Sequence, residues 1–587
     1  MMMENDCRKK ILRCILESAL VYLGLLAFIS ILSQSILYRH TEKLFASAVL
    51  IMSASYMYKN RKRYLAICGT AEFLLLSVLL IYYFVNDGSQ TSLVVDYMSF
   101  SLNAICLVTL INSLLNYKLS KQILAGLCLL PVLTVAVVSW GYYLSTGAWF
   151  ASDTLLAVMQ SNFNESKEYL SDYLSATGLA VGIVILLAVI KLWWTLSSLN
   201  FFREQRWLKI WVALTVLACL IVGYKTRNNL VVNIVRDARS NLQKYDAFQA
   251  MQAKRKEQVK IALQDDNAAN GIFVLVIGES QNKEHMSVYG YNRKTTPWLE
   301  EVFRQDNFLK FTNAYSCHTH TVPVLTYALT AKNQYNELQL EHAISLLEAA
   351  EAAGYETAWL SNQVKYSAWD TPITVIAREA NQQSWLNHNI GETTATNFYD
   401  LKLLDSINNL KITDKMLVVI HLMGNHSTYE ERYPQAFEKF SGNNKGVDKY
   451  DNSILYNDYV VSQIYEQVQK LQGFKCLIYF ADHAEAVEEK LGHDSGRFVW
   501  SMTHIPMYIG FSEAFRQKDA AMVNTLRNSQ DKEFTNDLIF NMMLGLMNIK
   551  IQDIYEQEND ITRAYYNDDI RRFKTLYGKK LVREDLQ

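Results

Sequence analysis

IFVLVIGE (residues 272–279) and CLIYFADH (residues 476–483) are short apolar stretches that end on side chains able to bind a metal. Runs of this length, rich in β-branched and aromatic residues, predict buried strands of a parallel sheet. Ligands of an open α/β sheet bind just beyond the carboxyl ends of its strands. We therefore expect Glu279, Asp482 and His483 to meet at one edge of the sheet, where they could form a metal site.

Strand-like and helix-like segments alternate through the second half of the chain. Thr357–Leu360 and Met416–Met423 are expected to be further strands, and Glu341–Ala353 and Val460–Leu471 are expected to be helices. This alternation is typical of a mostly parallel sheet with helices on both faces. The pattern predicts an α/β catalytic domain over residues 271–587.

Nearly all the long apolar runs lie in residues 1–226. Because about 20 apolar residues cross a bilayer, we expect a transmembrane domain with about seven spans, at roughly 12–34, 43–58, 64–86, 95–116, 122–145, 176–198 and 207–225. The second span is left open, since it is short and contains Ser53 and Ser55. Lys and Arg fall mainly in alternate loops, which by the positive-inside rule places everything after residue 226 outside the cytoplasm.

Two further segments adjoin these spans. The long outer loop 147–175 contains a stretch, residues 155–166, in which apolar and polar groups alternate at helical spacing. This spacing predicts a helix at the membrane surface, with a solvated connector as the alternative. Residues 227–270 are charged and helix-prone, which predicts a helical linker to the catalytic domain.

Composition excludes some partners and leaves the compartment undecided. A net charge of -1 argues against a nucleic-acid binder, which would carry a strong basic excess. Of the eight cysteines, Cys317 and Cys476 are the two that follow residue 226. One possible pair does not make a disulfide framework, so the cysteines do not indicate a redox compartment.

The loop SCHTHTVP (residues 316–323) holds two threonines and two histidines, so it could supply a nucleophile or a further metal ligand. A threonine hydroxyl is a weak nucleophile until it is activated, and coordination to a metal activates it. A metal also offsets negative charge on a phosphoryl group during transfer. His426 and His493 lie in other loops that contain glycine and are further candidates.

Several motifs together resemble one enzyme family. VIGES (276–280), MSVYGYNRKTTP (286–297), HLMGNH (421–426) and YFADH (479–483) resemble, in this order, the motifs of the phosphoethanolamine transferases, which belong to the alkaline phosphatase and sulfatase superfamily. The family combines an N-terminal multi-span membrane domain with a periplasmic α/β domain. A sulfatase proper would need a Cys or Ser in a Cys/Ser-x-Pro/Ala-x-Arg context, which the sequence lacks.

The resemblance implies a role for each matching residue. Glu279, Asp482, His483 and Thr321 would bind a catalytic zinc ion, and Thr321 would also be the nucleophile, with Thr319 as the alternative. His426 and His493 would contact the phosphoryl group or a second zinc ion. In the outer loop, Ser161 and Glu165 would face the substrate, and Asn362 would line the same pocket. His318 and His320 could be further ligands of a second metal ion or simply loop residues.

The function implied is a zinc-dependent transferase in the bacterial inner membrane, multi-pass, with its catalytic domain in the periplasm. It would move phosphoethanolamine from phosphatidylethanolamine to a cell-envelope glycolipid, either the lipopolysaccharide core or lipid A, through a phosphothreonine. Two alternatives stay open: a phosphoglycerol transferase on the same fold, and a membrane sensor or scaffold with an inactive domain. The acceptor, the number of zinc ions and the oligomeric state are also left open.

Overall fold

The structure is a computed structural model. It describes residues 2–32, 37–72, 91–114, 176–197, 205–225, 230–263, 268–364, 372–387, 398–442 and 444–585, with short pieces of 123–155 and Arg227. The chain divides into two compact units, one built mainly from residues 1–155 and 170–239 and the other mainly from 240–587. Each unit is described by itself below.

The first unit is helical. Its long helices are α1 (Met2–Leu32), α2 (Leu37–Ser55), α4 (Thr91–Leu114), α8 (Ala176–Ser197) and α9 (Gln205–Lys225). Each of them overlaps one of the expected spans. Within the described residues, Leu208–Lys225 in α9 is long and apolar enough to cross a membrane, and Met98–Ile111 in α4 is a shorter apolar stretch. The count of seven spans therefore stays a prediction.

Helices also occupy most of the predicted linker. They are α10 (Leu230–Ala250) and α11 (Gln252–Ala262). In α11, the fully buried Arg255 donates from Nε to Glu348 at 3.0 Å, and a second guanidinium nitrogen lies 3.8 Å from Glu379. A buried ion pair of this kind ties α11 firmly to the α/β domain, because a buried charge without its partner is costly.

The α/β domain contains a seven-stranded sheet with the order β2-β8-β7-β1-β6-β4-β5. The strands are β1 (Gly271–Gly278), β2 (Phe308–Phe311), β4 (Glu356–Val364), β5 (Gln382–Asn387), β6 (Lys415–His421), β7 (Phe474–Ala481) and β8 (Met507–Phe511). β1 is parallel to β6 and β7, whereas β8 is antiparallel to both of its neighbours. The predicted mostly parallel sheet is thus confirmed, with β8 as the reversed strand.

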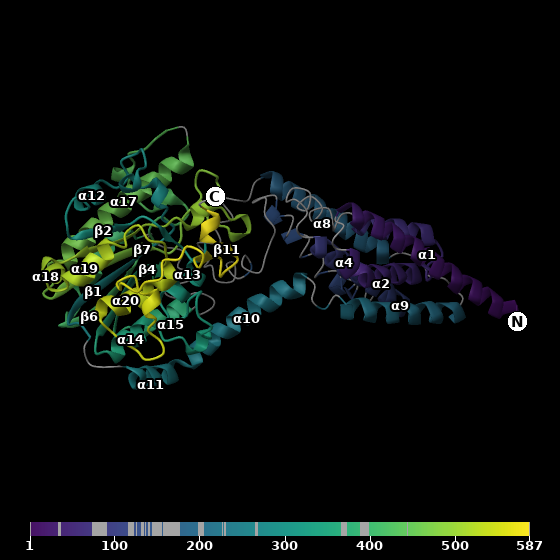
Figure 1. Cartoon of the computed structure of the whole chain (residues 1–587). Coiled ribbons are helices and arrows are strands. Elements are labelled where there is room, and N and C mark those ends of the chain that lie inside the picture. The colour runs from purple at the N-terminus through teal and green to yellow at the C-terminus, as the bar shows by residue number, and fades with distance from the viewer. Residues whose placement is uncertain are drawn as a thin grey trace. The chain divides into compact units, whose positions relative to one another are not determined.

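Helices cover both faces of the sheet (Figure 1). One face carries α12 (Pro297–Val302), α16 (Leu403–Asn408) and α17 (Lys445–Val468), and the other carries α13 (Thr321–Ala328), α14 (Leu346–Ala352), α15 (Pro372–Glu379) and α20 (Ile539–Met547). Ile272, Val274 and Val276 of β1 pack on the first face, and the residues between them pack on the second. Because both faces are buried, this strand is apolar throughout rather than alternating.

Smaller elements complete this domain: α18 (Glu513–Lys518), α19 (Ala520–Arg527), the pair β3 (Ala314–Tyr315) with β9 (Phe534–Thr535), and the hairpin of β10 (Lys574–Thr575) with β11 (Lys580–Leu581).

The predicted helix Val460–Leu471 is wrong at its start, because α17 begins at Lys445. Buried polar residues in the first turns of α17 interrupt the apolar pattern from which a buried helix is predicted. Asp451 accepts hydrogen bonds from Tyr291 at 2.9 Å and Arg293 at 2.7 Å, and Asp458 accepts from the backbone N–H of Trp298 at 2.8 Å. The motif 286–297, with Trp298 directly after it, therefore anchors α17 through these contacts.

Candidate active site

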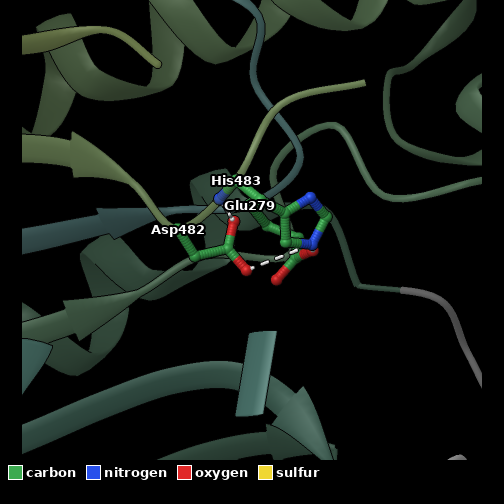
Figure 2. Close-up of side chains that lie close together, drawn as sticks. All are labelled: Glu279, Asp482 and His483. Atoms are coloured by element: carbon green, nitrogen blue, oxygen red, sulfur yellow. Dashed lines mark hydrogen bonds and ion pairs between the residues drawn. The ribbon is translucent and has the colours of Figure 1, made fainter. Parts of the chain in front are cut away.

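The paired strands β1 and β7 bring the three metal-competent side chains together. Glu279 directly follows β1, Asp482 and His483 directly follow β7, and Gly278 pairs with Ala481. Because the two strands are parallel, their carboxyl ends lie at the same edge of the sheet. The three side chains converge there and are at most 1% exposed (Figure 2). This confirms the expected meeting of Glu279, Asp482 and His483.

The spacing of the side-chain atoms suits a small cation. His483 Nε2 lies 3.3 Å from Glu279 Oε1 and 3.4 Å from Asp482 Oδ2, and the three potential ligand atoms all lie within 4.8 Å of one another. Zinc takes nitrogen and oxygen ligands at about 2.0–2.1 Å in a tetrahedron, whose edges are then about 3.3 Å. Two of the three separations therefore match the edges of a zinc tetrahedron.

A second observation supports the fit. Asp482 Oδ1 accepts hydrogen bonds from the backbone N–H groups of Ser280 at 3.0 Å and His483 at 2.6 Å. The other oxygen, Oδ2, is buried without a hydrogen-bond donor among the described residues. A buried carboxylate oxygen that lacks a donor is costly unless a cation satisfies it. The residues present thus fit a divalent metal ion.

The charges of the cluster point the same way. Burial works against ionisation of Glu279, but the hydrogen bond and charge of His483 outweigh it and lower the pKa of Glu279. Burial, followed by the charge of Glu279, raises the pKa of Asp482. Burial also opposes the charged ring of His483, yet the two carboxylates raise its pKa. Such a cluster holds protons that a divalent cation would displace.

Thr321 completes the group. It is the first residue of α13, and its Oγ1 lies 3.3 and 3.4 Å from the two carboxylate oxygens of Glu279 and 3.4 Å from His483 Nε2. The start of a helix also favours negative charge, because its first N–H groups have no partner within the helix. The alternative, Thr319, is fully buried, and its hydroxyl has no hydrogen-bond partner among the described residues.

Histidines extend from the triad on one side. The ring of His493 lies 4.4 Å from that of His483 and 5.4 Å from that of His320, and the ring of His320 lies 5.5 Å from that of His318. His426 is close enough for its charge to help lower the pKa of Glu279. The predicted candidates His426 and His493 are thus near the triad, and His320 and then His318 follow His493 in the same series of rings.

Other predicted residues have different surroundings. Asn362 in β4 is 1% exposed, and its amide donates to Asp400 Oδ1 at 2.9 Å, while Asp400 accepts from the backbone of Gly424 at 2.8 Å. Asn362 thus supports the loop after β6, and its substrate role stays a prediction. Ser161 and Glu165 lie outside the described residues.

Three residues near the site received no role from the sequence, although two of them lie within the quoted motifs. Glu485 is 2% exposed and its Oε1 lies 2.7 Å from His493 Nδ1, an orientation that leaves the other ring nitrogen available. Gly424 has a φ of +53°, and a Cβ there would lie 2.8 Å from the backbone of Glu279. Ser280 has a φ of +55°, which directs its N–H to Asp482. Their positions were the available signal, because Ser280 and Gly424 lie within the motifs 276–280 and 421–426 and Glu485 lies two residues after His483.

Comparison with known proteins agrees with this geometry. Residues 272–549 match the sulfatase family model. Phosphoethanolamine transferase EptC of Escherichia coli (strain K12) is 28% identical over 406 residues, which cover 61% of this chain and 69% of that protein. Phosphoethanolamine transferase CptA of Salmonella typhimurium (strain LT2) is 26% identical over 497 residues, which cover 76% and 85%.

A solved structure extends the likeness in fold beyond the catalytic domain. The integral membrane protein lipooligosaccharide phosphoethanolamine transferase A (EptA) from Neisseria meningitidis aligns with a TM-score of 0.58 at 22% identity, over 84% of this chain and 98% of that one. Residues 272–549 therefore form a sulfatase-family domain, and the two relatives by sequence named above are phosphoethanolamine transferases.

Proposed function

We propose that this protein transfers phosphoethanolamine from phosphatidylethanolamine to a cell-envelope glycolipid, with Thr321 as the carrier. The observation that carries the proposal is the Thr321 hydroxyl, which lies 3.3 to 3.4 Å from Glu279 and His483 in a buried triad. A hydroxyl held against metal-competent side chains at the start of a helix suits nucleophilic attack on phosphorus. The similarity to phosphoethanolamine transferases names the group that is transferred.

The first half-reaction forms the phosphothreonine. Thr321 Oγ1 attacks the phosphorus of phosphatidylethanolamine, a new O–P bond forms, and the bond from phosphorus to the diacylglycerol oxygen breaks. The proton of the Thr321 hydroxyl ends on that oxygen, so diacylglycerol leaves. Glu485 contacts Nδ1 of His493, so the other ring nitrogen of His493 points away from Glu485. That nitrogen can carry a proton or donate a hydrogen bond to a phosphoryl oxygen.

The second half-reaction restores the threonine. A hydroxyl or phosphate group of the acceptor glycolipid attacks the phosphorus, the Thr321–phosphorus bond breaks, and the proton of the attacking group returns to Oγ1. His426 lies near the carboxylate of Glu279 and would contact the same phosphoryl group. The acceptor is proposed to be the lipopolysaccharide core or lipid A.

The residues that would hold zinc are Glu279, Asp482, His483 and Thr321. The ion would lower the pKa of the threonine hydroxyl and offset negative charge on the phosphoryl oxygens. The buried Asp482 oxygen that lacks a donor supports this assignment. A second ion near His426 and His493 belongs to the same proposal.

The proposed location is the bacterial inner membrane, with the catalytic domain in the periplasm. The apolar helix α9 and the bias of Lys and Arg toward alternate loops support it. A membrane location suits the chemistry, since both donor and acceptor are lipids. Ser161 and Glu165 of the outer loop and Asn362 of the catalytic domain are proposed to face the substrate.

Intact-mass analysis after incubation with phosphatidylethanolamine tests the proposal. The parent protein and Thr319→Ala should gain a phosphoethanolamine adduct, whereas Thr321→Ala should gain none. An adduct on Thr321→Ala that is lost in Thr319→Ala would make Thr319 the nucleophile. A phosphoglycerol adduct would favour the phosphoglycerol transferase, and a protein that binds no zinc and forms no adduct would favour the scaffold. Glycolipid mass spectra of cells with and without the gene identify the acceptor.

A further inference from the structure

The loop that carries Thr321 is held by a hairpin from the far end of the chain. Thr575 is fully buried, and its hydroxyl donates to the backbone oxygen of Ser316 at 2.8 Å. The backbone N–H of Tyr577 donates to the oxygen of Cys317 at 3.5 Å. These two contacts hold the stretch that leads into Thr321.

The same hairpin also holds the other side of Thr321. The hydroxyl of Tyr577 donates to the backbone oxygen of Pro323, in the first turn of α13, at 2.8 Å. Its ring stacks on Tyr327 with centroids 4.4 Å apart and an interplanar angle of 25°, and lies 5.1 Å from the ring of His318. Tyr577 therefore contacts residues before and after Thr321 in sequence.

The tip of the hairpin has an unusual backbone. Leu576, Tyr577 and Gly578 are consecutive residues with φ of +51°, +55° and +86°. Residues other than glycine rarely adopt this left-handed backbone conformation, and it persists only where the surrounding structure enforces it. Strained backbone of this kind is found mainly at functional sites. We therefore expect the tip to do more than connect the two strands of the hairpin.

Contacts with the body of the domain enforce this conformation. The side-chain oxygen of Gln334 accepts a hydrogen bond from the backbone N–H of Gly578 at 3.1 Å. Its side-chain nitrogen donates to the backbone oxygen of Lys574 at 2.8 Å. Gln334 is itself held, because its N–H donates to Asp537 at 2.8 Å. The paired part of the hairpin is only two residues long on each strand, so these outside contacts, rather than its own ladder, fix its shape.

We propose that Thr575 and Tyr577 are positioning residues that fix the Thr321 hydroxyl against the metal-competent triad. This inference rests on the proposed function, because it assigns their effect to the step in which Thr321 attacks phosphorus. A nucleophile held in place reacts faster without binding substrate more tightly, and a misplacement of about 1 Å can cost about a hundredfold in rate. We call the contacts of Thr575 and Tyr577 with the Thr321 loop the clamp. Loss of the clamp should therefore lower kcat and leave KM nearly unchanged.

The test compares Tyr577→Phe and Thr575→Val in the full-length, zinc-loaded protein. Each variant removes one hydroxyl that bonds to the Thr321 loop and keeps the size of the side chain. The matched control is Tyr565→Phe, because Tyr565 is 79% exposed. Turnover of phosphatidylethanolamine and amide hydrogen exchange of residues 316–329 are measured, together with the thermal midpoint.

We expect both variants to lower kcat by at least about tenfold, with KM within about twofold of the parent. Exchange in residues 316–329 should be at least about tenfold faster, with the control unchanged in both measurements. Unchanged exchange in both variants would overturn the clamp, and faster exchange with parental kcat would overturn the positioning role. A parent protein that never turns over phosphatidylethanolamine would instead refute the proposed function, and the exchange data would still decide whether the clamp exists.

Discussion

Replacing Gly424 by alanine should weaken metal binding, although Gly424 is not one of the proposed metal ligands. Gly424 lies in the loop after β6 and has a φ of +53°. A Cβ at this position would lie 2.8 Å from both the backbone nitrogen and the oxygen of Glu279, whereas ordinary contacts begin at 3.4 Å. The difference, 3.4 − 2.8 = 0.6 Å, is the shift that the two backbone segments must share.

That shift is large for a metal ligand. Zinc sites tolerate ligand displacements of about 0.2 Å, and Glu279 has little room to compensate, since it is 1% exposed. Changes that move a ligand indirectly typically reduce metal affinity about 10- to 100-fold. We expect a loss in this range for Gly424→Ala, together with about 1–3 kcal/mol of destabilisation from overpacking and about 1–2 kcal/mol from the left-handed backbone.

The control separates the backbone penalty from the clash. Gly354 also has a positive φ, +84°, but a Cβ there would meet only the flexible end of Lys415 at 3.8 Å. Gly354→Ala should therefore show the backbone penalty with parental zinc affinity. The assays are zinc titration against a competing chelator and urea unfolding. Parental zinc affinity in Gly424→Ala, with a stability loss equal to that of Gly354→Ala, would refute the reasoning.

Two further predictions follow from the charges. Arg255→Met leaves the buried carboxylate of Glu348 without its cation, so urea unfolding should show a loss of about 3–5 kcal/mol. The partly exposed neighbour Lys256→Met should lose at most about 1 kcal/mol. Burial opposes the charged ring of His483, but the nearby carboxylates raise its pKa to about 10. Because zinc must displace that proton, its apparent affinity should rise by at least about tenfold per pH unit between about pH 6 and 8, and the raised pKa of Asp482 adds to this slope. A flat profile would contradict the assignment of His483 as a ligand.

The strands that carry the site were predictable because they are buried on both faces. Residues 272–277 and 476–481 lie within β1 and β7, and a continuous apolar run leaves few other interpretations. The start of α17 was not predictable, because Asp451 and Asp458 are polar residues that are buried in contacts with distant partners. The reversed strand β8 is only five residues long and has no periodicity that reveals its direction.

The sequence alone determined which side chains could bind a metal and that Glu279, Asp482 and His483 would share one edge of a sheet, since parallel strands present their carboxyl ends together. It left Thr321 and Thr319 as alternatives, because spacing along a loop does not specify direction. Only the tertiary structure places the Thr321 hydroxyl against Glu279 and His483 and brings Glu485 to His493 and Tyr577 to the Thr321 loop. The physical reason is that the contacts of Thr321 and Tyr577 join residues far apart in the chain, and that of Glu485 with His493, eight residues away, depends on the path of the segment between them. Packing rather than local pattern decides which of these residues meet.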